Sequence, residues 1–253
     1  MRVVPALDRG LEILQYVGAA TGPVKASELA KELKIPRTAV YELINTLRER
    51  EFIDQNSDGT VTLGPVLFTL GGKYAEQLDP TREAQSIASD LMRQCDETVQ
   101  IGVLRGRNVL YVARADPNRL VRLVSAVGRQ IPAHATAIGK ALLAQLEPAE
   151  LEALFRGVEL EALTAQTITD VAELNRQLDA IRETGVAYDN GESNLEVTCV
   201  AVPVIDVAGK CIAAISTSTT LGRMTPDRSV ELTEIVRGGA SRLSARLGYG
   251  AVL

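Results

Sequence analysis

The sequence predicts an α+β protein with a winged helix-turn-helix domain in residues 1–64, a linker helix in 65–79 and a second domain with a mainly antiparallel sheet in 80–253. The first domain is predicted by apolar residues at helical spacing on either side of a tight turn, followed by a hairpin pattern. The second is predicted by the mixed strand and helix patterns that begin after Asp79-Pro80, a dipeptide that disfavours helix.

The composition is ordinary for a globular protein: 253 residues, 46% hydrophobic, with a net charge of 27 minus 32, or −5. This charge excludes a protein that coats nucleic acid or anionic lipid through bulk electrostatics, and 4% aromatic residues without Trp disfavour binding of single strands. No apolar stretch approaches the roughly 18 residues of a membrane span, and the opening residues lack the apolar core of a signal peptide. We therefore expect a cytoplasmic protein with no membrane partner.

Cysteine and histidine are too few for a disulfide framework or a zinc site. Cys95, Cys199 and Cys211 are odd in number and far apart, which predicts reduced thiols. His134 is the only histidine, and neither CxxC nor HExxH occurs. We predict no metal and no cofactor.

Helical spacing organises the first domain. The first predicted helix has apolar residues at intervals of 4, 3 and 3, and a short helix over 26–33 is followed by a turn at Lys34-Ile35-Pro36. The next helix buries a second stripe and leaves polar residues free to face outward. The stripe of the first helix is Leu7, Leu11, Leu14 and Val17, and that of the helix after the turn is Val40, Ile44 and Leu47.

A β-hairpin with Asp58-Gly59 as its turn follows, between strands expected at 52–55 and 60–63. Helix, turn, helix and hairpin in this order are typical of a winged helix-turn-helix, whose second helix enters the major groove. The alternative that the spacing leaves open is a small three-helix packing module that binds protein or nothing. Residues 1–64 hold eight Lys and Arg against nine Asp and Glu, so the domain is not basic overall. Lysines and an arginine nevertheless gather at the turn, where phosphate contacts are expected.

The second domain is predicted to pair its neighbouring strands as antiparallel hairpins beneath covering helices. Strands are expected at 98–104, 109–115, 120–124, 199–206 and 210–218, and helices at 84–95, 136–146, 148–155 and 169–184. A terminal helix is expected to bury Val230, Ile235, Leu243 and Leu247.

No catalytic set is apparent, and we predict that the protein is not an enzyme. His134 is the natural general base, but no GxSxG elbow supplies a nucleophile, so a structural hydrogen bond is favoured for it. The Gly139-Lys140 pair fails the phosphate-loop pattern, which leaves Lys140 as a polar-face residue of its helix.

Two polar stretches allow more than one interpretation. Asp189, Glu192 and Glu196 match no calcium loop and are interpreted as a solvated turn. Ser216 and Ser218 alternate along a strand, so their hydroxyls share one face, either in a cavity for a small carboxylate or carbonyl compound or as satisfied core serines.

Six segments, in order, give the chain a resemblance to the IclR family of bacterial transcriptional regulators: ALDRGLEIL, ELAKELKIPRTAVYELINTL, VTLGP, IPAHATAIGKALLA, GVAYDNGESNLEVTCVAVPV and AAISTS. The resemblance implies a winged helix-turn-helix that reads operator DNA, a linker helix and a GAF-like effector-binding domain. It also implies a homodimer that can pair into a tetramer as a dimer of dimers.

The resemblance assigns DNA contacts to Arg37, Thr38 and Tyr41, with Lys34 near phosphate. Glu42 stands where the family commonly has arginine, so the operator sequence cannot be transferred. The effector is implied to be a small organic acid, a sugar acid or an aromatic carboxylate. The implied effector-binding residues are Leu120, Leu123, Ala137, Ile138, Asp189, Cys199, Ser216 and Ser218.

Overall fold

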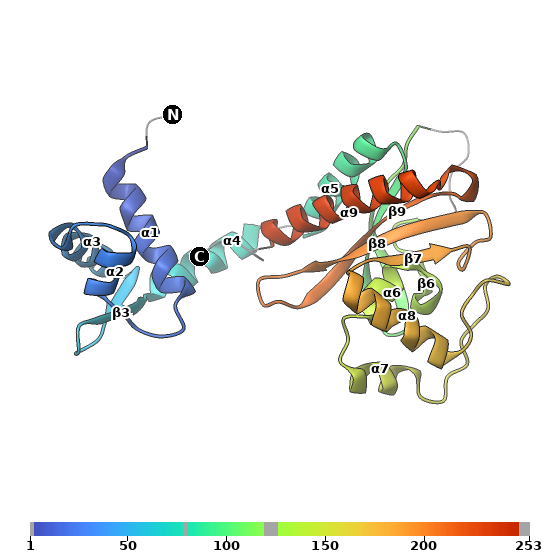
Figure 1. Ribbon diagram of the computed structural model, residues 1–253, viewed down its shortest axis with the longest axis horizontal. Coiled ribbons are helices and arrows are strands. Elements are labelled where there is room, and N and C mark those ends of the chain that lie inside the picture. Colours follow the sequence, from blue (N-terminus) through green and yellow to red (C-terminus); the bar gives the residue numbers. More distant parts are fainter. Residues whose placement is uncertain (1–2, 78–79, 119–125, 248–253) are drawn as a thin grey trace. The chain divides into compact units, whose positions relative to one another are not determined.

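The computed structural model describes residues 3–77, 80–118 and 126–247. The chain divides into an N-terminal unit that ends at Asp79 and a C-terminal unit that begins at Pro80. Both combine helices with antiparallel strands, as the α+β prediction requires (Figure 1).

The N-terminal unit packs three helices and a small sheet around one core. Val40 and Ile44 of the third helix are fully buried against Ile13 of the first helix and Ile53 of the hairpin. The sheet has the order β1-β3-β2, so the predicted hairpin gains an edge strand that the sequence pattern did not predict. The elements are α1 Pro5–Ala19, β1 Val24–Lys25, α2 Ala26–Glu32, α3 Arg37–Glu49, β2 Ile53–Gln55, β3 Thr60–Leu63 and α4 Pro65–Gln77.

The buried face of α1 agrees with the predicted one at Val17 and at the partly buried Leu14, but differs from it in the first half of the helix. Ile13 and Val17 point into the core, whereas Leu7 is 63% exposed and Leu11 is 51% exposed. Both faces satisfy helical spacing, and contact with α3 and β3 selects the one that contains Ile13. Leu7 and Leu11 therefore form an uncovered apolar strip within this unit.

The turn between α2 and α3 depends on one unusual backbone conformation. Lys34 has φ of +55°, in the left-handed region, and this bend carries the chain from the end of α2 to Pro36, which precedes α3. Ile35 between them is buried and anchors the turn to the core. The exposed face of α3 is thereby fixed relative to α2.

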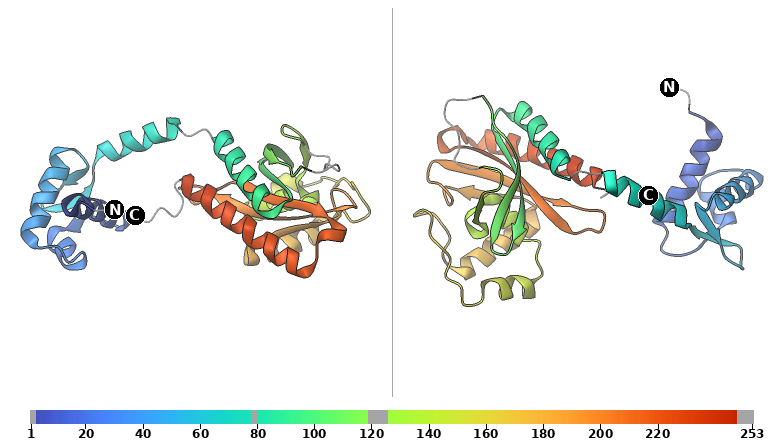
Figure 2. Two further views of the ribbon diagram at one scale, coloured as in Figure 1. Left: turned by 90° about the horizontal axis from the view of Figure 1, so that it is seen from above. Right: turned by 180° about the vertical axis from the view of Figure 1, so that it is seen from behind.

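The C-terminal unit is a six-stranded antiparallel sheet in the order β6-β5-β4-β9-β8-β7, covered on both faces by helices (Figure 1 and Figure 2). The predicted hairpins are confirmed: β4 pairs with β5, and β8 pairs with β9. The strands are β4 Thr98–Arg105, β5 Asn108–Ala115, β6 Gln130–Pro132, β7 Ala187–Asn190, β8 Val197–Ile205 and β9 Cys211–Thr220. The helices are α5 Pro80–Cys95, α6 Ala137–Leu143, α7 Pro148–Phe155, α8 Val171–Thr184 and α9 Pro226–Arg246.

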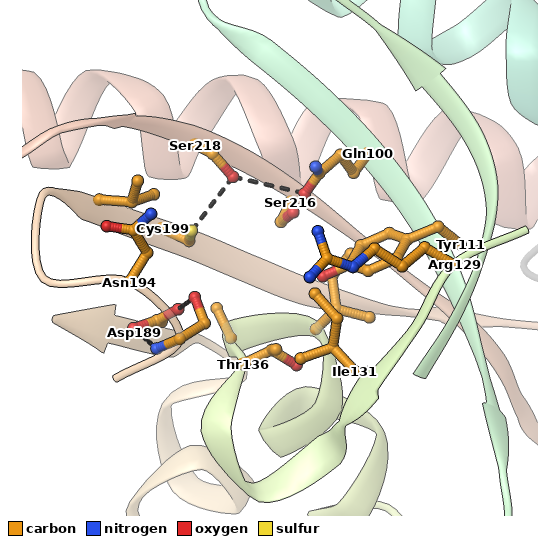
Figure 3. A pocket seen from close by; sticks show the side chains of 14 residues that line it. Gln100, Tyr111, Arg129, Ile131, Thr136, Asp189, Asn194, Cys199, Ser216 and Ser218 are labelled. Atoms are coloured by element: carbon orange, nitrogen blue, oxygen red, sulfur yellow. Dashed lines mark hydrogen bonds between the residues drawn. The ribbon is translucent and has the colours of Figure 1, made fainter. Parts of the chain in front are cut away.

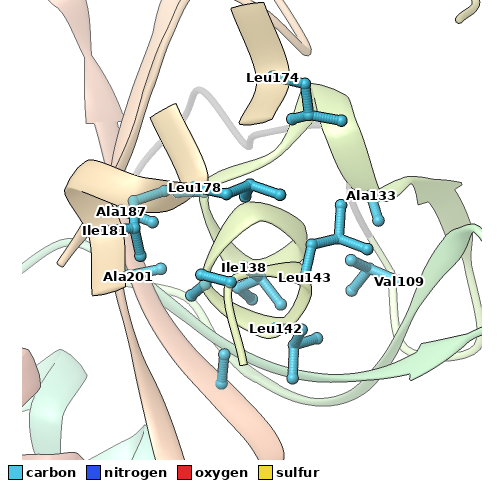
Figure 4. Packing of buried hydrophobic residues seen from close by; sticks show 14 of the residues in the cluster. Val109, Ala133, Ile138, Leu142, Leu143, Leu174, Leu178, Ile181, Ala187 and Ala201 are labelled. Carbon is cyan, nitrogen blue, oxygen red and sulfur yellow. The ribbon is translucent and has the colours of Figure 1, made fainter. Parts of the chain in front are cut away.

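Strand alternation divides this unit into two cores. One face of the sheet packs against α5 and α9 through residues such as Ile101, Val200 and Ile215. The opposite face packs against α6 and α8, where Ile138, Leu143 and others meet the sheet (Figure 4). Gln100 and Ser216 are the chain neighbours of Ile101 and Ile215, so their side chains point to the opposite face of the sheet, toward α6.

Several sequence expectations differ from this fold. The edge strands β6 and β7 were not predicted, and the strand expected at 120–124 lies outside the described residues. Val230 of α9 is 66% exposed, and Leu232 and Val236 are buried in its place. The predicted face of α9 is wrong at that end because contact with the sheet selects the neighbouring stripe.

Candidate functional site

The first candidate surface is the exposed side of α3. Arg37 and Thr38 lie at the start of the helix and are exposed, and Tyr41 one turn later is 54% exposed. Lys34 is exposed in the turn before them. Because Val40 and Ile44 occupy the buried face, all four predicted DNA-contact residues lie on accessible positions of the turn and the helix that follows it.

The hairpin beside α3 is tied to it and internally braced. Arg48 of α3 donates a hydrogen bond to Gln55 of β2 at 2.9 Å between Nη1 and Oε1. At the tip, Asp58 accepts hydrogen bonds from the hydroxyl and amide of Thr60, which lower the pKa of the Asp58 carboxyl, and Gly59 supplies the positive φ of +79°. These contacts give the helix and hairpin a fixed geometry.

The second candidate site is a cavity of about 280 Å³ in the C-terminal unit, between the α6 side of the sheet and the start of α6 (Figure 3). A cavity near the lower end of the range for small-molecule sites suits a compact ligand. Its lining is Gln100, Tyr111, Arg129, Ile131, Thr136, Ala137, Ile138, Asp189, Ser193, Asn194, Val197, Cys199, Ser216 and Ser218.

One wall is a row of polar side chains on β4, β8 and β9. Cys199 lies opposite Ser218 in the strand register, with 3.1 Å between Sγ and Oγ. Ser218 in turn donates to the Gln100 amide oxygen at 3.4 Å, and Ser216 lines the same wall two residues earlier. Burial raises the pKa of the Cys199 thiol well above its ordinary value, so this wall is uncharged at neutral pH.

Asp189 of β7 lies beside Cys199 in the strand register and adds a carboxyl group to the same side of the cavity. The carboxyl is fully buried, and the loss of hydration raises its pKa to about 6. Its Oδ1 accepts hydrogen bonds from the backbone amides of Glu192 at 2.7 Å and Ser193 at 3.4 Å, and its Oδ2 accepts from the Ser193 hydroxyl at 2.6 Å. The side chain is held in place while still lining the cavity.

The start of α6 closes the base of the cavity. Thr136 caps the helix, since its hydroxyl accepts the Gly139 N–H at 2.9 Å, and Ala137 and Ile138 line the cavity. Gly139 allows the first turn of α6 to lie close to the backbone of Ala133, because a Cβ at position 139 would lie 2.0 Å from the Ala133 carbonyl oxygen.

The structure therefore brings together six of the eight predicted effector residues: Ala137, Ile138, Asp189, Cys199, Ser216 and Ser218. The other two, Leu120 and Leu123, lie outside the described residues. Ser216 and Ser218 both line the cavity, which agrees with the first of the two interpretations of these serines.

The predicted effector residues did not include six polar residues of the cavity: Gln100, Tyr111, Arg129, Thr136, Ser193 and Asn194. Arg129 is exposed at the mouth with its guanidinium pointing into the cavity, close to Tyr111 (Figure 3). The alternation of β4 and β5 was a signal for Gln100 and Tyr111. Arg129 and Asn194 lie outside regular elements, where no local periodicity marks them.

Two interpretations from sequence are wrong. Lys140 is not a polar-face residue, because its side chain is 1% exposed and pairs with Glu192 at 2.6 Å. The segment of Asp189 and Glu192 is not a solvated turn, since both are buried, although Glu196 is exposed. His134 makes the structural hydrogen bond expected of it, with 3.0 Å between Nε2 and the Glu161 carbonyl oxygen.

Across the described ranges, no group of three or more His, Cys, Asp or Glu side chains is placed to hold a metal ion. Within the same ranges, no helix has the length and apolarity needed to cross a membrane.

Comparison with known proteins agrees with the two units. The IclR helix-turn-helix domain matches residues 6–57, and the C-terminal domain of bacterial transcriptional regulator IclR matches residues 72–245. The chain is 32% identical to the HTH-type transcriptional regulator XynR of Escherichia coli K12, over 99% of this chain and all of that one. It is also 32% identical to the HTH-type transcriptional repressor AllR of Klebsiella pneumoniae, over 96% of this chain and 90% of that one.

Solved structures show the same arrangement of elements. The crystal structure of the Agobacterium tumefaciens repressor BlcR superposes with a TM-score of 0.87 at 26% identity, covering 98% of this chain and 99% of that one. Both halves of the chain match family domains, and the relatives match over nearly their whole length. The chain is therefore a member of the IclR family of bacterial transcriptional regulators.

Proposed function

We propose that this regulator binds a specific operator through α3 and its hairpin, and that a small organic or aromatic acid in the C-terminal cavity modulates that binding. The observation that carries the proposal is the cavity, where an arginine at the mouth and a wall of neutral hydroxyl, thiol and amide groups surround a space of about 280 Å³. Such a set of polar groups in a small cavity is typical of a site that orients a compact polar ligand.

The operator is read by Arg37, Thr38 and Tyr41, and Lys34 contacts a phosphate. Arginine makes bidentate hydrogen bonds to guanine in the major groove, and Thr38 and Tyr41 extend the same exposed face. Glu42 on this face accepts from cytosine N4 and repels phosphate, which gives this chain an operator preference of its own.

An acid fits the mouth of the cavity better than a neutral compound or a cation, whereas the Asp189 carboxyl on the β7 side favours a donor group of the same ligand. The Arg129 guanidinium supplies a bidentate partner for a carboxylate, and Ser216, Ser218 and Gln100 supply further hydrogen bonds. The α6 N-terminus adds little to anion binding, because this helix has only seven residues and Thr136 already accepts one of its amide hydrogens. Arg129 is therefore the main determinant of ligand charge.

Regulation requires that the acid bind one arrangement of the assembled protein better than another, since only differential affinity shifts a conformational equilibrium. A coupling of about 1–3 kcal/mol changes operator affinity about 5- to 150-fold. We infer repression of the controlled promoter, which is supported by the names of AllR and BlcR as repressors.

The working form is a homodimer, and two dimers can pair into a tetramer. Support comes from large apolar side chains that the N-terminal unit itself leaves uncovered, among them Phe68 at 88% exposure and Leu7 at 63%. Apolar patches of this kind mark interfaces in soluble proteins. A dimer also presents two recognition helices to a pseudo-palindromic operator.

Two other functions are disfavoured by particular observations. An enzyme that uses His134 needs a free imidazole in a reactive site, but Nε2 of His134 is engaged by the Glu161 carbonyl oxygen. An interaction module without DNA binding is disfavoured by the match to the IclR helix-turn-helix domain.

The test is a gel-shift titration of the purified protein on the DNA upstream of its own gene, with scrambled competitor at fixed salt, because salt controls the non-specific part of binding. Glycolate, gluconate, benzoate and 4-hydroxybenzoate are then added as probes for small, sugar and aromatic acids. We expect a discrete complex that resists competitor and whose midpoint moves with at least one acid. A complex that scrambled DNA removes equally well would overturn the DNA-binding half of the proposal.

A further inference from the structure

Lys140 of α6 is buried, although its ammonium does not line the ligand cavity. Its side chain is 1% exposed, and its Nζ donates to Glu192 Oε1 at 2.6 Å and to Gln177 Oε1 at 2.9 Å. Burying an ammonium is costly unless the charge is paired and hydrogen-bonded. Lys140 is not one of the residues that line the cavity.

The partners of Lys140 lead to the cavity wall. Glu192 is 5% exposed, and its backbone N–H donates to Asp189 Oδ1 at 2.7 Å. The Glu192 carbonyl oxygen accepts from the Thr167 hydroxyl at 2.6 Å, so side chain and backbone are both held. Lys140 thus reaches Asp189 through one intervening residue.

The charges in this cluster do not balance without Lys140. Two buried carboxyl groups lie close together in sequence, Asp189 in β7 and Glu192 in the loop after it, and Oε2 of Glu192 has no hydrogen-bond partner within the described part of the chain. An apolar pair of similar volume is often as stable as a buried ion pair, so stability alone does not account for this one. The geometry instead links the ammonium to the carboxylate that faces the ligand.

We propose that Lys140 is a positioning residue that acts through Glu192 to hold Asp189 against the cavity and to keep it ionised as a hydrogen-bond acceptor for a donor group of the effector. The inference rests on the proposed function, in which this cavity binds the effector. It makes the effector an acid with a hydroxyl or amino donor, with its carboxylate toward Arg129 and its donor toward Asp189.

The charges around Asp189 determine the direction in which each neighbour shifts its pKa. Burial raises the pKa of Asp189 and the Glu192 charge adds to this rise, whereas the hydrogen bonds from Ser193 and from the Glu192 N–H and the Lys140 charge lower it, so that the pKa lies at about 6. Asp189 is therefore mainly ionised at neutral pH and gains a proton as the pH falls through about 6. The groups that face Asp189 are Glu192 and Ser193 of the loop after β7, Lys140 of α6, Cys199 of β8, Tyr111 of β5 and Arg129 at the mouth. Burial keeps Cys199 and Tyr111 neutral in this range.

The experiment titrates Asp189 directly in the full-length protein labelled with ¹³C at the aspartate carboxyl, with Asp189→Asn to assign the signal. We expect a midpoint near pH 6 that rises by about 0.3 pH unit or more in Lys140→Met, about a twofold or larger change in the protonation equilibrium. The midpoint should fall in Glu192→Gln. In the double variant Lys140→Met/Glu192→Gln it should return toward the value of the unmodified protein, because opposite charges are removed together.

The double variant guards against misfolding, since it leaves no unpaired charge where the ion pair was. The binding arm measures affinity for glycolate, gluconate, benzoate and 4-hydroxybenzoate between pH 5 and 8. We expect binding at pH 7 to weaken in Lys140→Met and to recover in the double variant. An unchanged Asp189 midpoint in both single variants would overturn the inference. A loss of affinity in Lys140→Met by the same factor at every pH would also overturn it. If no acid binds the unmodified protein, the proposed acid class fails while the titration still decides the link from Lys140 to Asp189.

Discussion

Replacing Arg129 by Gln should weaken binding of an acidic effector about 5- to 30-fold. At about 4 Å a guanidinium and a carboxylate attract each other by about 1 kcal/mol in water and by about 4 kcal/mol at an effective dielectric of about 20. Arg129 is exposed at the mouth of the cavity, so its interaction lies toward the weaker limit. Hydrogen bonds to charged groups add to this attraction, which gives a net loss of about 1–2 kcal/mol.

The assay is isothermal titration calorimetry of the full-length protein with the acid that moves the gel-shift midpoint. The matched control is Arg107→Gln, because Arg107 is also an exposed arginine of the C-terminal unit but does not line this cavity. The neutral amide of the same acid should bind Arg129→Gln and the unmodified protein equally. If Arg129→Gln binds the acid as tightly as Arg107→Gln does, Arg129 does not determine ligand charge and the argument for an acid loses its main support.

Three further predictions follow from the fold and its surfaces. Arg37→Ala should weaken specific operator binding by about 1–3 kcal/mol in a gel-shift titration, because a bidentate base contact is lost. Phe68→Glu should convert the dimer to monomer in light-scattering measurements at micromolar concentration, because it places a charge in an apolar interface. Gly139→Ala should lower the free energy of unfolding by at least about 2 kcal/mol in urea titrations, because the new Cβ meets the Ala133 carbonyl at 2.0 Å.

Each variant has a counterpart that should behave differently. Arg156→Ala removes the same charge from the position directly after α7, where the side chain is exposed, and should leave operator binding unchanged. Val207→Glu adds a charge at a 74% exposed turn position and should leave the oligomer intact. Gly10→Ala meets no atom within 4 Å inside α1 and should stabilise the protein slightly. If a variant and its counterpart give the same result, the role assigned to that residue is wrong.

Local pattern was sufficient for the hairpins and the recognition turn. The pair β8 and β9 is specified by alternation on either side of Ala208-Gly209, and the turn before α3 by Pro36 between two apolar stripes. Their boundaries agree with prediction within a few residues because the signals lie within each segment. Ser216 and Ser218 were placed on one face for the same reason.

Pattern failed where a distant partner decides the outcome. Lys140 belongs on a polar face by composition, and its burial depends on Gln177 and on Glu192, which is 52 residues later, as partners of its ammonium. In α1 the stripes with Leu7 and with Ile13 are both helical, and packing against α3 and β3 determines which is covered. Arg129 enters the cavity from irregular backbone, for which periodicity carries no information.

The central claim is that one molecule couples the cavity to the operator surface, and thermodynamic reciprocity tests it most directly. Operator affinity is measured with and without saturating acid, and acid affinity is measured with and without saturating operator DNA, on the same full-length protein at one salt concentration. The account predicts that the two affinities change by the same factor, between about 5 and 150. A factor of one in both measurements would show that acid binding and operator binding are independent and would contradict the account.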